Sequence, residues 1–518
     1  MMKKILLFTF LPFLSLADGI DKKIDEAFAP ISNFFSNVVF FTINDIPFVL
    51  MLLVFSALFF TIYFVFPNIR YFKVAINTVR GKYDDLDNNS KNDEDIKGTI
   101  KDESKDGEVS HFQALATAVS GTVGNGNIAG VALAIALGGP GATFWMIICG
   151  LLGMSTKFVE CTLGVQYRDV DEDGTVYGGP MYYISKGLKD RGFEIFGKIA
   201  AILFAIFCIG GSFGGGNAAQ SNQATIVLKD LMGLESTAAG AIIGCVIAII
   251  VGVIIIGGIK RIANVTEKVV PFMAVMYLLA CLYIILSNYT FIDDAISLII
   301  SEAFNPTAIG VGSVIGVLLV GFKRAAFSNE AGAGSASIAH SAVKTKYSAS
   351  EGLVALLEPF IDTVVICTMT ALVIIIFNFG GFFEYGGDGG MVYIDGIGYE
   401  GAGITSKAFA QYIPFSNIFL TVAVVLFAVS TMISWSYYGL QSWKFIFGRG
   451  YYADLTYKIL FLLFIVIGAA SSMSSIWAFS DAMIFAMIFP NMVGLFFLFP
   501  VVKNELNRYL EAIKKNNL

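Results

Sequence analysis

Two short stretches place asparagine, serine and glutamate among glycines inside runs that are otherwise apolar. The first, SGTVGNGNIAG, covers residues 120–130, and the second, AFSNEAGAGS, covers residues 326–335. Both follow one plan, because each has an asparagine two residues before an Ala-Gly pair. This pattern predicts that a helix is interrupted there, which frees backbone N–H and C=O groups to bind a ligand.

Close helix packing is the alternative explanation for the glycines. Gly126 and Gly130 have the spacing of small residues that let two membrane helices approach each other. Packing alone does not require the polar residues of the two stretches, which are Asn125, Asn127, Ser328, Asn329 and Glu330. Polar side chains at membrane depth are costly and usually functional, so we favour a binding site.

The elements that carry these stretches are predicted to be membrane-spanning helices. The chain has 518 residues, of which 56% are hydrophobic and 14% charged, and its mean hydropathy is +0.73. A soluble domain needs a more polar surface than this, whereas about 20 apolar residues in a helix cross a bilayer. We predict an all-α membrane protein with eleven spans, at residues 48–66, 112–137, 142–165, 199–228, 237–259, 269–286, 306–341 (interrupted), 352–377, 415–443, 454–473 and 476–502.

Lysine and arginine set the orientation of these spans. They gather in alternate loops, at residues 70–105, 168–198, 260–268, 344–346, 444–458 and 503–515. Because positively charged loops stay in the cytoplasm, the C-terminus is predicted to be cytoplasmic and the N-terminus exterior. Residues 1–19 fit a signal peptide, with Lys3 and Lys4 before an apolar run. A membrane-surface helix is the alternative for this segment.

This topology divides the chain into six segments. They are a candidate signal peptide (1–19), an exterior segment with the first transmembrane helix (20–66), a cytoplasmic linker (67–111), a first inverted repeat (112–287), a second inverted repeat (288–502) and a cytoplasmic tail (503–518). Residues 83–109 are too polar to fold alone. Residues 378–414 form the longest exterior segment, which fits either an ordered lid or an ordinary surface loop.

Other function classes lack their residue patterns. The nearest nucleotide-binding signature, at residues 192–198, is followed by Ile199 where a P-loop needs serine or threonine. The six cysteines have no paired spacing and are interpreted as packing residues. Two histidines, His111 and His340, are too few and too far apart in sequence for a metal site. An enzyme is therefore not expected, whereas a channel stays open as an alternative because glycine-rich segments also line pores.

Five motifs carry a specific resemblance. They are GTVGNGNIAGVA at residues 121–132, TKFVECTLGVQYR at 156–168, GGPMYYI at 178–184, GNAAQ at 216–220 and KRAAFSNEAGAGSASIAH at 323–340. Through them the chain resembles the alanine or glycine:cation symporter family, from residue 112 to the C-terminus. The resemblance implies a leucine-transporter-type fold of five-plus-five inverted repeats, here with one additional N-terminal helix.

The resemblance also implies an activity and its partners. We expect import of alanine or glycine coupled to sodium, across the plasma (inner) membrane of a bacterial-type cell. Sodium is then the coupling ion, and no other cofactor is expected. The protein is expected to lie in a lipid bilayer and not to bind a nucleic acid. The oligomeric state is left open.

A zwitterionic amino acid needs donors for its carboxylate and acceptors for its ammonium group. Freed N–H groups at the positive end of a half-helix suit the carboxylate, and they belong to Gly124, Asn125, Gly126 and Asn127. Carbonyl groups around Phe327 and Ser328 suit the ammonium. Asn127 could instead cap its own half-helix.

Further substrate contacts are expected on two other helices. The resemblance makes Gln220 substrate-facing, ahead of Gln223 one turn later. Phe327 and Trp435 could close around a methyl-sized side chain, although either aromatic could also be ordinary core. Thr431 lies four residues before Trp435, so both share one helix face.

The sodium ion needs hard oxygen ligands. By resemblance, its ligands are the carbonyl groups of Ser120, Val123 and Phe427 and the hydroxyl groups of Ser430 and Thr431. The alternative for both hydroxyl groups is a hydrogen bond back to their own helix.

Charged residues inside the spans need partners. Lys157 and Glu160 have helical spacing and predict a structural ion pair near the cytoplasmic end.

Lys323 and Arg324 lie deeper in the membrane than the positive-inside rule expects. We predict that these two cations form ion pairs with Glu330 or Asp362. Glu330 could alternatively carry a coupling proton, so a proton-driven carrier is a further alternative.

Overall fold

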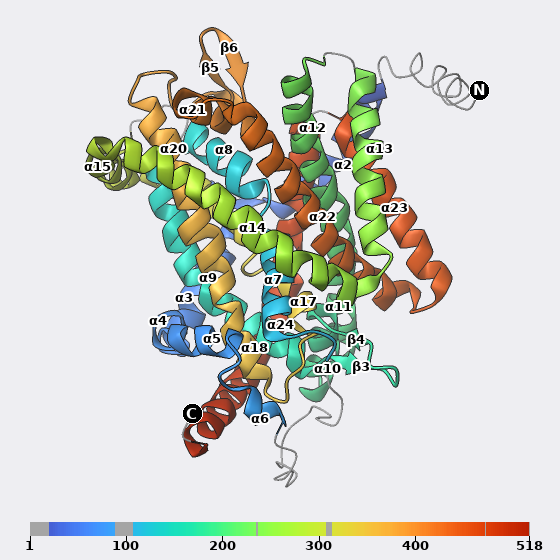
Figure 1. The fold of residues 1–518 in the computed structure, drawn as a ribbon. Coiled ribbons are helices and arrows are strands. Elements are labelled where there is room, and N and C mark those ends of the chain that lie inside the picture. Colours follow the sequence, from blue (N-terminus) through green and yellow to red (C-terminus); the bar gives the residue numbers. More distant parts are fainter. Residues whose placement is uncertain (1–19, 89–106, 235–236, 307–312, 472, 517–518) are drawn as a thin grey trace, which may run out of the picture.

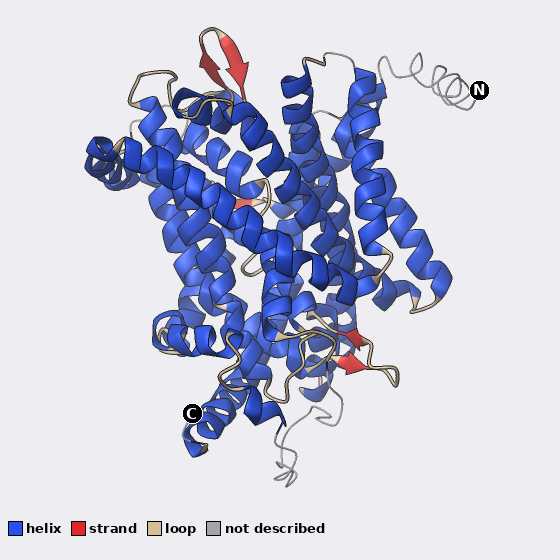
Figure 2. Cartoon of the chain, viewed as in Figure 1, coloured by secondary structure: helices blue, strands red, loops and turns tan. Residues whose placement is uncertain are grey.

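The computed structural model describes residues 20–88, 107–234, 237–306, 313–471 and 473–516. The predicted signal peptide, residues 1–19, lies outside these ranges. The described chain is almost entirely helical, with three short hairpins (Figure 2). Helices suit an apolar chain because they pair every backbone group internally.

The helical elements follow one another closely along the chain. The first of them are α2 (Ile20–Val39), α3 (Phe48–Tyr63), α4 (Pro67–Arg70), α5 (Phe72–Val79), α6 (Asp84–Asn88), α7 (His111–Thr122), η2 (Gly126–Gly130), α8 (Val131–Gly138), α9 (Gly141–Gln166), α10 (Pro180–Asp190), α11 (Glu194–Phe213), η3 (Gly214–Ala218), α12 (Ala219–Met232), α13 (Thr237–Ile255) and α14 (Gly258–Ser287). They continue with η4 (Tyr289–Phe291), α15 (Ile292–Phe304), α16 (Val314–Asn329), α17 (Ala336–His340), α18 (Ser348–Ala355), α19 (Leu357–Pro359), η5 (Phe360–Cys367), α20 (Thr368–Asn378), η6 (Asp388–Gly390), α21 (Ala402–Tyr412), α22 (Ser416–Phe447), α23 (Tyr451–Ala470) and α24 (Met473–Lys515). The antiparallel hairpins pair β1 (Thr42–Ile43) with β2 (Ile46–Pro47), β3 (Asp169–Val170) with β4 (Val176–Tyr177), and β5 (Val392–Ile394) with β6 (Ile397–Tyr399).

Seven helices in the described ranges are long and apolar enough to cross a membrane. They are Gly141–Gln166, Glu194–Met232, Gly258–Ser287, Ser348–Asn378, Ser416–Phe447, Tyr451–Ala470 and Ile476–Lys515. The bent pair of α7 with η2 and α8 makes an eighth if it is one span. Helix length and composition therefore establish a polytopic helical membrane protein and account for seven or eight of the eleven predicted spans.

Helices also occupy segments predicted to lie outside the spans, among them α5, α10 and α21. α14 begins at Gly258, so residues 260–268, predicted as a cytoplasmic loop, form its first turns. α24 continues to Lys515 through most of the predicted tail. Leu506 and Tyr509 are buried and hold this last part of α24 against the protein.

The polar stretch 83–109 is anchored at both of its described ends. Tyr83 and Leu86 are buried, and the N–H groups of Glu108 and Val109 both donate to the carbonyl of Ala342, at 2.7 and 3.1 Å. The predicted linker therefore packs against the rest of the protein at these two ends. The few apolar side chains at these ends, such as Tyr83 and Leu86, pack against other parts of the protein because the polar stretch itself contains few apolar residues.

The two ends of the molecule differ. The C-terminus, α6, α10 and the β3–β4 hairpin lie at one end, which we call the C-terminal face, and α21 with the β5–β6 hairpin lies at the opposite end (Figure 1). In α21, Thr405 is buried and its Oγ1 donates to the carbonyl of Ile128 at 3.1 Å. Part of segment 378–414 is thus ordered and contacts η2 through α21, and its role as a lid stays a prediction.

Candidate functional site

The first polar stretch interrupts its helix where predicted. α7 ends at Thr122, η2 begins at Gly126, and the helix axis bends by 50° between them. A Cβ at Gly124 would lie 2.4 Å from Thr431 Oγ1. Only glycine therefore lets the broken backbone approach α22 this closely.

The second polar stretch also ends a helix. α16 stops at Asn329, Glu330 takes a left-handed backbone conformation with φ of 54°, and the helix resumes as α17. Asn329 Oδ1 accepts a hydrogen bond from the N–H of Ala331 at 3.0 Å, which stabilises the turn. The two interruptions face each other, because a Cβ added at Gly126 would lie 3.5 Å from Ser328.

Asp362 of η5 joins the two interruptions. Its Oδ1 accepts a hydrogen bond from Asn127 Nδ2 at 2.6 Å, and its Oδ2 accepts from Ser328 Oγ at 2.9 Å and from Thr363 Oγ1 at 2.7 Å. The side chain is fully buried, and a buried carboxyl group needs such donors. This role of Asp362 was not predicted from the sequence, although an ionisable residue inside an apolar span is a signal of such a role.

Asn127 braces the first interruption. Its Oδ1 accepts the N–H of Gly124 at 2.9 Å while its Nδ2 binds Asp362. The N–H of Asn125 donates to Gln220 Oε1 at 3.0 Å. The backbone N–H of Asn127 donates to the carbonyl of Gly124 at 3.1 Å, so three of the four N–H groups predicted to hold a carboxylate are already paired within the protein. A ligand reaches those of Gly124 and Asn125 only if the side chains of Asn127 and Gln220 turn away.

A small cavity lies between the two interruptions. Its volume is about 10 Å³, room for about one water molecule. Six predicted substrate residues line it, namely Gly126, Gln220, Phe327, Ser328, Thr431 and Trp435, and the other lining residues are Gly121, Thr122, Gly215, Glu330 and Ile484. Gly124, Asn125 and Asn127 lie outside this lining. An amino acid is larger than the cavity, so lining side chains must move when one binds.

Trp435 and Glu330 form one wall of the cavity. Trp435 Nε1 donates to Glu330 Oε1 at 2.9 Å. A Cβ at Gly216 of η3 would lie 2.2 Å from Trp435 Cγ, so a glycine at this position lets α22 approach η3 closely. Phe327 stacks on Trp477 with 5.3 Å between the ring centroids. The two predicted aromatics therefore border the cavity and do not face lipid.

The residues predicted to bind sodium gather where α7 meets α22. Ser120 Oγ donates to the carbonyl of Ser430 at 2.7 Å, and Ser430 Oγ donates to the carbonyl of Phe427 at 3.0 Å. Ser430 thus takes the back-bonded arrangement that was the alternative. The backbone leaves the helical conformation at Val123, with ψ of 86°. Thr431 Oγ1 is buried and has no hydrogen-bond partner in the described part of the chain, so it is available to a ligand.

The charge pairing within the predicted spans differs from the prediction. Lys157 Nζ lies 3.0 Å from Glu358 Oε1 of α19, while Glu160 Oε1 accepts from Asn491 Nδ2 at 2.7 Å. The predicted ion pair between Lys157 and Glu160 is therefore wrong. The carboxylate that pairs with Lys157 lies on the neighbouring helix α19, and not on α9, which carries Lys157 and Glu160.

The prediction for Lys323 and Arg324 is also wrong. Both side chains pair with Asp481 of α24, Lys323 at 3.0 Å, and neither pairs with Glu330 or Asp362. These two cations lie on the side of α16 that packs against α24, whereas the two carboxyl groups belong to the interruptions.

Comparisons with known proteins cover most of the chain. The sequence model of the sodium:alanine symporter family matches residues 30–518. The sodium/alanine symporter AgcS of Methanococcus maripaludis is 39% identical over 472 residues, which are 91% of this chain and 95% of that protein. The putative sodium/proton-dependent alanine carrier protein YrbD of Bacillus subtilis is 35% identical over 81% of this chain and 84% of its own length.

A solved structure shares the fold. The crystal structure of MhsT in complex with L-phenylalanine superposes with a TM-score of 0.50 at 14% identity, over 77% of this chain and 99% of that one. This structure has the leucine-transporter-type fold. At this identity the likeness shows the arrangement of helices only.

Proposed function

The chain belongs to the sodium:alanine symporter family, and we propose that it imports alanine or glycine together with sodium. The family consists of transporters, so the chain is a cation-coupled amino-acid transporter and not an enzyme. The choice of amino acid and of sodium as the coupling ion is the proposal.

The cavity between the two interruptions is the observation that carries the proposal. It lies where two broken helices face each other, and six of its lining residues are those predicted to contact substrate. Phe327 and Trp435 border this cavity, and two bulky aromatic side chains beside a binding site favour a substrate with a small side chain.

The two ends of the amino acid find complementary groups in this arrangement. The broken end of α7 offers N–H groups to the carboxylate once Gln220 and Asn127 release those of Asn125 and Gly124. The carbonyl groups of Phe327 and Ser328, at the end of α16, accept the ammonium. Burial makes both pairings strong because water does not compete for them.

Sodium is proposed to bind between α7 and α22. Its ligands are the carbonyl groups of Ser120, Val123 and Phe427 with the hydroxyl groups of Ser430 and Thr431. Support comes from Thr431 Oγ1, which has no hydrogen-bond partner among the described residues. The ion and the amino acid then share Thr431 and the first interruption, which is how binding of one favours binding of the other.

Proton coupling is the second candidate. Glu330 lines the cavity, and Trp435 donates a hydrogen bond to its carboxyl group without neutralising its charge, so Glu330 can carry a proton. In addition, one relative is named as a putative sodium/proton-dependent alanine carrier. Either ion drives the same cycle, in which one helix bundle rocks against the other around the site.

The proposed topology has eleven spans, as two five-helix inverted repeats after one N-terminal helix. The C-terminal face then lies in the cytoplasm. The proposed membrane is the plasma membrane, which agrees with the bacterial origin of several relatives.

Uptake into liposomes tests the proposal. Purified protein should accumulate labelled alanine or glycine under an inward sodium gradient and should not do so when choline replaces sodium. Equal accumulation with choline under an inward proton gradient would instead favour proton coupling. Solute flux that does not saturate would favour a channel.

A further inference from the structure

Buried ionisable side chains connect helices on the side of the C-terminal face, and the substrate site uses none of them. His111 begins α7 and His340 ends α17, so each belongs to a half of an interrupted span. Both imidazoles contact the carboxylate of Glu351 in α18: His340 Nδ1 lies 2.5 Å from Oε1, and His111 Nδ1 contacts Oε2. One carboxylate thus holds together half-helices from both interrupted spans.

The chain of contacts continues toward α9. His340 Nε2 lies 3.5 Å from Glu358 Oε2, and Glu358 Oε1 accepts from Lys157 Nζ at 3.0 Å. Neither His340 Nε2 nor Glu358 Oε2 has a hydrogen bond within the described ranges, although both residues are fully buried. A bare nitrogen lone pair and a carboxylate oxygen repel each other, so this pair is attractive only when it holds a proton.

Charge balance also calls for protons here. Glu351, Glu358 and the neighbouring Glu160 are carboxylates, and Lys157 is the permanent cation that directly pairs with one of them. Unbalanced charge is strongly unfavourable in a buried site, so carboxylates in excess retain protons or gain protonated partners. Protons on the two imidazoles restore neutrality.

Other titratable and charged groups surround this cluster. They are Glu160 and Cys161 of α9, Glu330 after α16, Tyr438 of α22, Arg168 after α9, and Glu505 of α24, which accepts a hydrogen bond from Ser348 at the start of α18. Arg168 donates to the carbonyl of Ser341, next to His340. Carboxyl groups outnumber permanent cations in this set, so the surroundings reinforce the need for protons.

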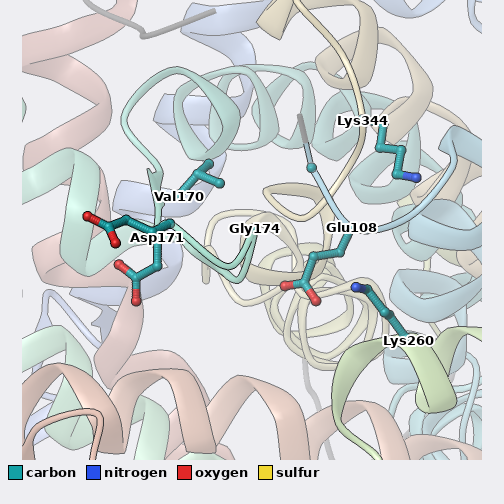
Figure 3. A pocket seen from close by; sticks show the side chains of 8 residues that line it. Glu108, Val170, Asp171, Gly174, Lys260 and Lys344 are labelled. Carbon is teal, nitrogen blue, oxygen red and sulfur yellow. The ribbon is translucent and has the colours of Figure 1, made fainter. Parts of the chain in front are cut away.

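A surface pocket opens near the cluster on the C-terminal face (Figure 3). Its volume is about 340 Å³, and its lining includes Glu108, Lys260 and Lys344. Glu108 precedes His111 by three positions and Lys344 follows His340 by four, so the pocket lies over the ends of both half-helices. Burial raises the pKa of Glu108, and the N–H of Val176, which bonds its carboxylate, opposes this. The pocket therefore brings solvent to the chain segments that lead into His111 and follow His340.

We propose that Glu351 with His111 and His340 forms a proton-binding site that holds α7 and α17 together, so that cytoplasmic protons oppose opening of the transporter on that side. The orientation rests on the proposed function, which places the C-terminal face in the cytoplasm. A protonated imidazole donates a charge-assisted hydrogen bond to Glu351, about twice as strong as a neutral one. Loss of that proton weakens the link between the half-helices, and opening becomes easier.

Histidine NMR tests the site independently of transport. The chain has two histidines, so 15N-histidine labelling of the tag-free protein reports on this cluster alone. The two imidazole signals should titrate as a coupled pair, and Glu351→Gln should shift both. If that variant does not fold, His340→Gln should shift the signal of His111. Two rings that titrate independently, each like a free imidazole in water, contradict the proposal.

Transport at different internal pH tests the consequence. In right-side-out membrane vesicles, lowering the internal pH from about 10 to about 8 should slow alanine uptake about fivefold in the wild type, because the carboxylate partners keep protons on the imidazoles to high pH and the charge-assisted bonds form over this range. His111→Gln and His340→Gln should remove this response, and Asp173→Asn on the exposed β3–β4 loop should keep it. Wild-type transport without any response to internal pH overturns the inference and leaves the proposed function intact. If alanine is not transported at all, the proposed function fails and the NMR titration alone decides the inference.

Discussion

Trp435 donates its indole N–H to Glu330 Oε1, with 2.9 Å between the two atoms. Trp435 lies on α22, four residues after Thr431, and Glu330 ends α16 at the second interruption. The bond therefore joins the helix that carries the proposed sodium ligands to the half-helix that offers acceptors to the substrate. If sodium or substrate binding moves α22 or α16, this hydrogen bond couples that movement to the other helix.

Trp435→Phe removes the donor and keeps an aromatic ring in the cavity wall. Glu330 then loses a buried partner, which costs about 1–3 kcal/mol, so the Kd for alanine should rise about 5- to 150-fold. Equilibrium binding of labelled alanine to purified protein measures this. Trp443→Phe on the same helix is the matched control, because its Nε1 has no hydrogen-bond partner among the described residues. Equal effects of both substitutions would refute a special role for Trp435.

Thr431→Val removes the hydroxyl group proposed to bind sodium while preserving the shape of the side chain. The sodium concentration for half-maximal uptake should rise at least about tenfold, which corresponds to about 1.4 kcal/mol. Thr431→Ser retains a hydroxyl group and should stay close to the wild type. If valine at this position left the sodium dependence unchanged, the ion site would have to lie elsewhere.

Gly126→Val should abolish alanine binding without preventing membrane insertion. The new side chain would enter a cavity of about 10 Å³ beside Ser328, and that space cannot hold both valine and substrate. Gly130→Ala is the control, because a Cβ there would have nothing nearer than Trp477 at 4.0 Å. Alanine binding and the amount of protein in the membrane fraction measure the two effects. Normal transport by Gly126→Val would move the substrate site.

Lys157→Met should lower the free energy of unfolding by about 3–5 kcal/mol, because it leaves the carboxylate of Glu358 buried without its cation. The double variant Lys157→Met with Glu358→Gln should lose less than the single variant. Denaturant-induced unfolding in detergent measures the free energy of unfolding of both variants. A double variant less stable than Lys157→Met would show that the pair is not the cause.

Local sequence was enough to place the two interruptions. Glycine next to asparagine inside an apolar run has few structural explanations, since unpaired backbone groups are not tolerated against lipid. The breaks after Thr122 and Asn329 follow the prediction. Gln220, placed from the family resemblance, and Trp435, placed as an aromatic that could close around a small side chain, both line the cavity.

Pairing between distant helices could not be read from sequence. Lys157 selects Glu358 over Glu160, and Arg324 selects Asp481, because the choice depends on which helices adjoin. Helical spacing reports on neighbours within one helix only. Asp362 was missed for the same reason, because its donors lie on the interrupted helices.

The histidines illustrate the same limit. His111 and His340 are far apart in the chain, and their number and distance argued against a metal site but said nothing of a shared carboxylate partner. The fold brings both onto Glu351, which sequence spacing did not reveal.

Equilibrium binding with and without sodium tests the central claim most directly. If the amino acid and the ion share the first interruption and Thr431, sodium raises the affinity for alanine, and alanine raises the affinity for sodium by the same factor, about 5- to 150-fold. Both factors are measured by titrating purified protein with each ligand at fixed concentrations of the other, with choline maintaining ionic strength. Equal alanine affinity in sodium and in choline contradicts the account.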